Sequence, residues 1–303
     1  MITRRALVTT AVCASALAGF GRAPVLAGLD AASGTFPFTV LPISTDNALE
    51  EAGKFWAAGS VPIITGPDDK LSLMKRGFES PDVNPVSELA ATLKRAGEIR
   101  FPEDLRELRY NENKAACEAL TEQMALPGFK LPEMFEPDAD NKQVQISPDE
   151  VRQRLLAGCT EQQPPNLDEW PEADSVEEVP TEALLTALIG EAGNGNIIVV
   201  PTDDWTKVPA LLRWGGWNSN PLPEYHIAAW RSWRDRYGAK LLGMTDDTLI
   251  MTVERPPSGR KEAYQLAEEQ YIYCSDIVDQ GVGTIPKLAA GLVSSKFWYF
   301  WWD

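Results

Sequence analysis

The end of the chain constrains the fold more than any other stretch. Six consecutive aromatic residues, Phe297-Trp298-Tyr299-Phe300-Trp301-Trp302, precede the final aspartate. Each such side chain buries roughly 150–250 Å² when it leaves water, and a run this short is typical of a strand buried on both faces. Because a terminal strand must be held in place to be ordered, we expect the chain from about Asn196 onward to pack around it.

Length and charge limit the protein class. The 303 residues allow one large domain or two of ordinary size. A hydrophobic content of 44% and a charged content of 24% are typical of globular chains, so disorder throughout is not expected. The formal net charge of -16 disfavours nucleic acid as a partner, because nucleic acids select basic surfaces.

Residues 1–27 have the three-part pattern of a secretory signal peptide. Arg4 and Arg5 precede an apolar run from Ala6 to Phe20, and small residues follow near Ala27, where we expect cleavage. The paired arginines resemble a twin-arginine export signal. The apolar run is shorter than the roughly 20 residues that span a bilayer, so no integral membrane segment is expected in the mature chain. We predict a periplasmic or secreted protein, with a membrane-anchored or cytoplasmic protein as the alternatives.

Three cysteines, Cys117, Cys159 and Cys274, follow the predicted signal peptide. An odd number allows at most one internal disulfide, so the chain is not a disulfide scaffold. Cys117 with Cys159 is the favoured pair, because Cys274 falls on a predicted core face. Whether this pair forms a bond depends on a geometry that spacing does not supply.

The domain organisation follows from an acidic segment in the middle of the chain. No lysine or arginine lies between Arg154 and Lys207, whereas eleven aspartates and glutamates do, and prolines interrupt the stretch. This pattern predicts a solvated linker over 161–180. Residues 28–160 before it mix a strand with several helical patterns, which predicts a mixed α/β region.

Residues 181–303 form the second predicted domain, and their periodicity predicts an α+β fold. After a helix at 181–192, the order is a strand at 197–200, a helix at 223–237, a hairpin at 241–253, helices at 263–274 and 284–292, and the aromatic strand. This β-α-β-β-α-(α)-β order favours a ferredoxin-like arrangement. We expect helices on one face of a largely antiparallel sheet, with the terminal strand inside the sheet.

Five motifs in this region occur in a fixed order: Arg213-Trp214-Gly215-Gly216-Trp217-Asn218, Arg236-Tyr237-Gly238-Ala239, Ala267-Glu268-Glu269-Gln270-Tyr271, Tyr273-Cys274-Ser275-Asp276-Ile277-Val278-Asp279-Gln280-Gly281 and Tyr299-Phe300-Trp301-Trp302-Asp303. Together they resemble a bacterial family, domain of unknown function 4253, over about residues 196–303. The family has no established activity, ligand, cofactor or catalytic residue, so the resemblance implies none for this chain.

Two candidate binding features lie early in this region. Trp217 and Asn218 follow paired glycines, which allow close backbone approach, so they are candidates for a groove wall. His226 is the only histidine, which excludes sites with several histidine ligands. It shares a predicted helical face with Trp230 and Trp233, which favours a packed, hydrogen-bonded histidine over a catalytic base.

A third candidate feature is the pair Asp276 and Asp279. Two carboxylates three residues apart can share a cation or divide acid and base roles. Equally, they can cap the next helix and accept bonds from turn amides.

Two functions remain open. The first is a non-enzymatic binding or interaction module, with a protein as one candidate partner, because no nucleophile–base pair is readable. The second is an envelope hydrolase that uses Asp276, Asp279 and His226. Neither a metal site nor a cofactor is predicted.

Overall fold

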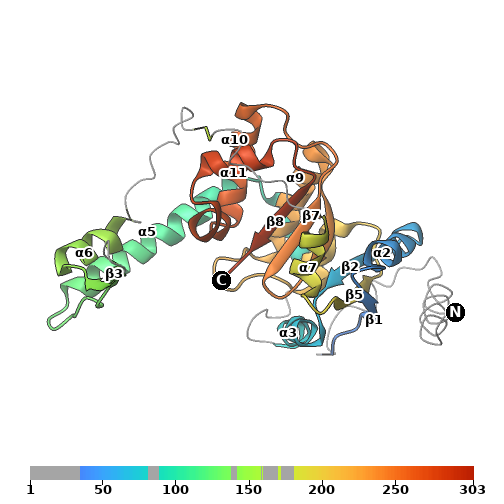
Figure 1. Cartoon of the computed structure of the whole chain (residues 1–303), viewed down its shortest axis with the longest axis horizontal. Helices are drawn as coiled ribbons and strands as arrows, with labels where there is room; N and C mark the ends of the chain where they lie inside the picture. Colours follow the sequence, from blue (N-terminus) through green and yellow to red (C-terminus); the bar gives the residue numbers. More distant parts are fainter. Residues whose placement is uncertain (1–34, 81–88, 138–141, 158, 160–169, 172–180) are drawn as a thin grey trace. The chain divides into compact units, whose positions relative to one another are not determined.

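The computed structural model describes residues 35–80, 89–137, 142–157, 159, 170–171 and 181–303 (Figure 1). The predicted signal peptide, and the predicted acidic linker apart from Trp170 and Pro171, lie outside these ranges. The chain divides into two compact units, unit 1 with residues 1–101 and 168–303 and unit 2 with residues 102–167. Among the described residues, no helix is both long enough and apolar enough to cross a membrane.

Unit 1 is built on a six-stranded sheet with the order β1-β5-β2-β6-β7-β8. Neighbouring strands are antiparallel except β2 and β6, which are parallel. The sheet is therefore mixed, and with its helices it gives the predicted α+β class. The strands are β1 Thr39–Ser44, β2 Val61–Thr65, β5 Asn194–Val200, β6 Lys240–Met244, β7 Thr248–Thr252 and β8 Phe297–Trp301.

The expected ferredoxin-like order is not observed. β2 lies between β5 and β6, and the terminal strand β8 lies at the edge of the sheet beside β7, not inside it. β1 and β2 precede segment 161–180, whereas β5 to β8 follow it. The sheet thus contains strands from both sides of the expected linker, because β5 pairs with β1 on one edge and with β2 on the other. This grouping differs from the division into 28–160 and 181–303.

The helices expected after residue 181 are all present, and local signals explain their ends. α9 begins at Pro223, and Gly238 ends it with φ of +62°. The Thr284 side chain accepts a bond from the Lys287 amide and caps α11. The elements are α7 Thr181–Ile189, η3 Trp205–Lys207, α8 Val208–Leu212, α9 Pro223–Tyr237, α10 Arg260–Tyr273, η4 Ile277–Val282 and α11 Ile285–Leu292.

Helices cover both faces of the sheet, not one face as expected. On the first face, α2 (Ala48–Ala57) and α7 pack on β1, β5 and β2, where Phe55 and Leu188 join one hydrophobic cluster with Ile64. On the second face, α9 and α10 supply large aromatic side chains that contact β8. The central strands are buried on both sides because each face has its own helical layer.

The aromatic strand β8 is buried on one face only, which corrects the expectation of two. Trp298 and Phe300 are buried, whereas Tyr299 between them is 37% exposed. Phe300 stacks on Trp233 of α9 with ring centroids 5.6 Å apart. The exposed face follows from the position of β8 at the sheet edge, because α2 and α7 contact β2 and β5 near the other edge.

Unit 2 contains the long helix α5 (Glu103–Ala125), a short hairpin of β3 (Phe135–Pro137) and β4 (Gln143–Gln145), and α6 (Pro148–Ala157). A disulfide joins Cys117 of α5 to Cys159, with Cα atoms 5.6 Å apart. The sequence favours the same pair, and Cys274 is free and buried as expected. The bond joins α5 to the segment just after α6 within the unit.

Candidate functional site

A pocket of about 420 Å³ lies in unit 1, where β2, β6 and β8 end. Five segments that are distant in sequence form its walls: Phe36 before β1, α3 (Asp68–Glu79), the end of α8 with the loop after it, the turn between β6 and β7, and the residues after β8. The segments that follow β2, β6 and β8 meet beside the same ends of the strands, because β2 and β6 are parallel and the start of β7 pairs with the end of β8. The large apolar side chains of the lining are Phe36, Leu73, Met74, Phe78, Trp214, Trp217 and Trp302.

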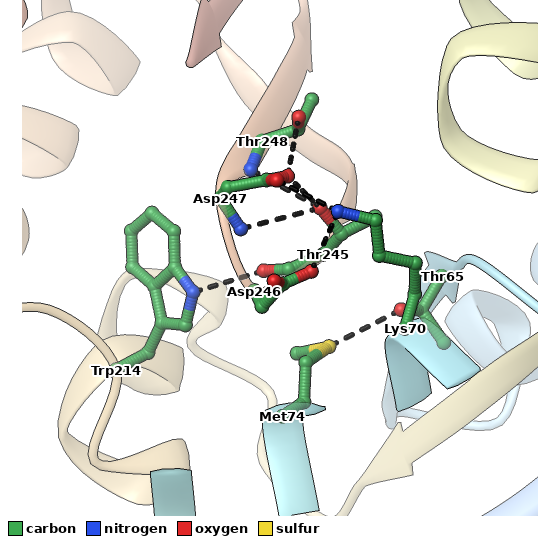
Figure 2. Close-up of polar contacts among 8 residues, drawn as sticks. All are labelled: Thr65, Lys70, Met74, Trp214, Thr245, Asp246, Asp247 and Thr248. Carbon is green, nitrogen blue, oxygen red and sulfur yellow. Dashed lines mark hydrogen bonds and ion pairs between the residues drawn. The ribbon is translucent and has the colours of Figure 1, made fainter. Parts of the chain in front are cut away.

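The α3 wall is held by contacts with its neighbours. The Thr65 hydroxyl at the end of β2 donates to Sδ of Met74 at 3.2 Å (Figure 2). The Arg213 guanidinium lies 4.4 Å from the centre of the Phe78 ring and donates to the Phe78 carbonyl at 3.1 Å. Arg213 therefore fixes α3 to the loop after α8.

The loop wall depends on the backbone of its two glycines. Gly215 has φ of +113°, and a Cβ there would lie 2.2 Å from the Pro221 carbonyl oxygen and 2.8 Å from Nε2 of His226. The Gly216 amide donates to the carbonyls of Asn220 and Pro221, at 3.1 and 2.9 Å. Only glycine fits such a close approach with positive φ. The turn that follows presents Trp217 at the pocket.

His226 supports this loop from behind. Its side chain is fully buried, with Nε2 2.7 Å from Oδ1 of Asn220 and Nδ1 2.6 Å from the Tyr273 hydroxyl. Asn220 and Tyr273 therefore hold both ring nitrogens of the imidazole in hydrogen bonds. The same hydroxyl accepts from the Trp230 indole at 2.9 Å. The histidine is thus a packed, hydrogen-bonded residue that positions the loop.

Two tryptophans of the pocket wall pack against the imidazole ring of His226. The ring centroids of Trp214 and Trp302 lie 4.7 and 5.9 Å from that of His226. The Trp214 indole also donates to the Thr245 carbonyl at 2.9 Å (Figure 2). One end of the pocket wall is therefore joined to the β6–β7 turn.

That turn provides the charged end of the pocket. Nζ of Lys70 on α3 lies 2.7 Å from Oδ2 of Asp247 and 3.2 Å from Oδ1 of Asp246 (Figure 2). Asp247 also accepts from the hydroxyls of Thr245 and Thr248, at 2.8 and 3.0 Å. Oδ1 of Asp246 is buried, and its contact with Lys70 is an ion pair without the geometry of a hydrogen bond.

The two neighbouring carboxyl groups have opposite pKa shifts. Burial, and then the charge of Asp247, raise the pKa of Asp246, and Lys70 offsets this only in part. Burial also acts to raise the pKa of Asp247, but the hydrogen bonds from Lys70 and the two threonines outweigh it, so that pKa is lowered. The carboxylate of Asp247 is therefore fully hydrogen-bonded within the protein, whereas that of Asp246 has fewer hydrogen-bond partners.

The structure places the predicted binding residues in two groups. Trp217 and Asn218 line the pocket, and His226 lies behind its loop wall. Asp276 and Asp279 are not among the lining residues. Asp276 accepts from the Asp303 amide at 2.9 Å, and Asp279 accepts from the Tyr271 hydroxyl at 3.3 Å. Both carboxylates thus contact neighbouring parts of the chain.

Sequence reasoning missed the opposite wall and the charged end. Asp246 and Asp247 are adjacent in a turn, and that doublet was the available signal, although the turn was interpreted only as a hairpin connection. Lys70 gave no signal, because 177 positions separate it from Asp247. Within the described ranges, no three histidine, cysteine, aspartate or glutamate residues are grouped as ligands for a metal ion.

Unit 1 is thus an α+β domain with an aromatic-walled pocket and a charged turn beside the ends of its strands. Residues 196–303 match the family described as Domain of unknown function (DUF4253), which confirms the resemblance seen in the sequence. The matched stretch contains β5 from Asn196 onward, β6 to β8 and the loop wall, whereas β1, β2 and α3 precede it. Comparison with curated proteins and with solved structures gave no match.

Proposed function

We propose that this protein is a non-enzymatic binding module that holds a small organic ligand in the pocket between α3 and the loop after α8. The pocket itself carries the proposal. Its volume of about 420 Å³ lies within the range of small-molecule sites. Its lining combines aromatic and aliphatic side chains with a few polar groups, which is the composition such sites share.

No observation on the described residues favours the hydrolase alternative. Both ring nitrogens of His226 are engaged by Asn220 and Tyr273, so the histidine has no free position for a substrate proton. The buried Cys274 thiol donates to the Trp301 carbonyl, and burial raises its pKa to about 12. A thiol with such a pKa is not a nucleophile at neutral pH.

We also propose that the protein is exported, to the periplasm or beyond, by the twin-arginine-like segment 1–27. The disulfide between Cys117 and Cys159 supports this, because such bonds persist in oxidising compartments. Mass spectrometry of the periplasmic fraction tests the proposal, and we expect a mature chain that begins near Gly28. Full-length protein found only in the cytoplasm would contradict it.

Binding is tested with a neutral apolar fluorophore, N-phenyl-1-naphthylamine, and two matched glycine variants. Gly77 on α3 lines the pocket, and a Cβ there meets no atom within 4 Å. Gly77→Phe should therefore fill the pocket without a backbone clash and abolish the fluorescence increase. Gly53→Phe on α2, where a Cβ also meets nothing within 4 Å, is the control and should bind as wild type does.

Equal binding by both variants would place the probe elsewhere and contradict the proposal. No binding by the wild-type protein would contradict it as well.

A further inference from the structure

The charge around the pocket is unbalanced. Two carboxylates of the β6–β7 turn share the one ammonium of Lys70, and the exposed Asp303 also lines the pocket. The positive side chain among the lining residues, Arg213, already lies over the Phe78 ring and donates to the Phe78 carbonyl. The charged end of the pocket therefore carries excess negative charge.

Within this end, Asp246 is the group that can accept a further partner. Asp247 accepts from Lys70, Thr245 and Thr248, whereas Asp246 has the Lys70 ion pair on Oδ1. The Asp246 side chain is 26% exposed although Oδ1 is covered. The exposed surface therefore falls on the rest of the side chain, which includes Oδ2.

The aromatic walls are suited to the same kind of ligand. The rings of Trp214, Trp217 and Trp302 line the pocket beside the turn. The face of an aromatic ring attracts an organic cation, and tryptophan does so most strongly. The formal net charge of -16 also favours the approach of cations over anions.

From this arrangement we infer that the ligand is an organic cation, with an apolar or aromatic body among the tryptophans and a protonated amine on the carboxylate of Asp246. The inference rests on the binding function proposed above and specifies its ligand class. A bare metal ion fits less well, because the described residues offer no group of three ligands for it.

The test uses three competitors of nearly equal shape against bound N-phenyl-1-naphthylamine: 2-phenylethylamine, 2-phenylethanol and 3-phenylpropionate. The wild-type protein should bind the amine at least about tenfold more tightly than the alcohol, the factor expected of a charged hydrogen bond. The carboxylate should bind most weakly. Asp246→Asn should remove the advantage of the amine over the alcohol.

Asp279→Asn is the matched control, because it removes one negative charge outside the pocket. It should retain the preference for the amine. Equal affinity for amine and alcohol in a wild-type protein that binds the probe would overturn the inference and leave the binding function intact. Loss of the preference in Asp279→Asn, or displacement of the probe by millimolar Ca²⁺, would also overturn it. If the probe itself fails to bind, the proposed function fails and this inference fails with it.

Discussion

The indole N–H of Trp214 donates to the main-chain carbonyl of Thr245 at 2.9 Å, across 31 positions of the sequence. This bond joins the glycine-containing loop wall to the turn that carries Asp246 and Asp247. Both groups are buried, so the bond is shielded from water. The aromatic wall and the charged end of the pocket are thus one connected unit, and a change in either should affect the other.

Trp214→Phe should reveal this connection. It keeps an aromatic ring but leaves the Thr245 carbonyl buried and unpaired, which costs about 1–3 kcal/mol. The free energy of unfolding, measured with urea, should fall by that amount. Trp217→Phe on the same loop is the control, because Trp217 is partly exposed, and it should change stability little. An equal decrease in the free energy of unfolding in the two variants would show that the Trp214–Thr245 hydrogen bond does not contribute to stability.

Gly215→Ala should destabilise the protein more than an ordinary glycine substitution. The new Cβ would clash with the Pro221 carbonyl and with His226, at a φ of +113° that alanine rarely adopts. We expect a lower melting temperature and weaker binding of the neutral probe. Gly291→Ala in α11 meets no atom within 4 Å, and it should stabilise by up to about 1 kcal/mol. A Gly215→Ala protein with the wild-type melting temperature would refute the close approach.

Asp246 and Asp247 should respond oppositely to pH. The folded-state pKa of Asp247 is lowered. Its ionised carboxylate therefore stabilises the folded protein at pH values above the unfolded-state pKa of about 3.9, and this stabilisation is lost as the pH falls through the folded-state pKa. The folded-state pKa of Asp246 is raised, so its ionisation opposes folding as pH rises past that unfolded value.

At pH 7, Asp247→Asn should lower the melting temperature by about 2–4 °C, since one partly exposed charged hydrogen-bond group contributes about 1 kcal/mol. The difference from wild type should disappear in acid. Asp246→Asn should cause no loss, or a gain. Melting curves between pH 3 and 8 measure both, and a larger loss for Asp246→Asn would reverse the assignment.

The cysteines offer a test of unit 2. In a chain that begins at Gly28, the denatured, unreduced protein should show one reactive thiol, Cys274, and the native protein none, because Cys274 is buried. Replacing Cys117 and Cys159 by serine should cost unit 2 about 4 kcal/mol, the chain-entropy value for a separation of 42 residues. Hydrogen exchange should increase in α5 and α6 but not in the sheet. Faster exchange in β5 to β8 would contradict this.

The sequence predicted local structure in the C-terminal third well, because its signals there are local. Pro223 and Gly238 mark the ends of α9, and Thr284 caps α11, as their residue types indicated. It did not predict the strand order. The insertion of β2 between β5 and β6 depends on pairing between residues more than 120 positions apart, and no periodicity encodes such pairing.

Of the residues that the sequence singles out, Trp217 and Asn218 line the candidate pocket. Paired glycines between tryptophans are locally unusual, which is why the sequence points to them. Asp276 and Asp279 were chosen for their spacing, but spacing does not show whether a side chain faces a cavity. The Lys70–Asp247 ion pair was missed because charged residues are common on any surface, and only the fold brings these two together.

The last prediction concerns the aromatic strand. Phe300 is fully buried and stacks on Trp233, whereas its neighbour Tyr299 faces the other side of the sheet and is 37% exposed. Phe300→Ala should cost about 3–5 kcal/mol, out of a total of about 5–15 kcal/mol for such a protein. Tyr299→Ala should cost about 1 kcal/mol, the typical value for a substitution outside the core.

Trp301 is half-buried, with its ring against Gly281 of η4. Trp301→Ala should therefore give an intermediate loss. Urea unfolding of the three variants measures this order directly. If Tyr299→Ala lowered the free energy of unfolding as much as Phe300→Ala does, β8 would be buried on both faces after all. Only a second covered face would make the substitution at Tyr299 as costly as the one at Phe300.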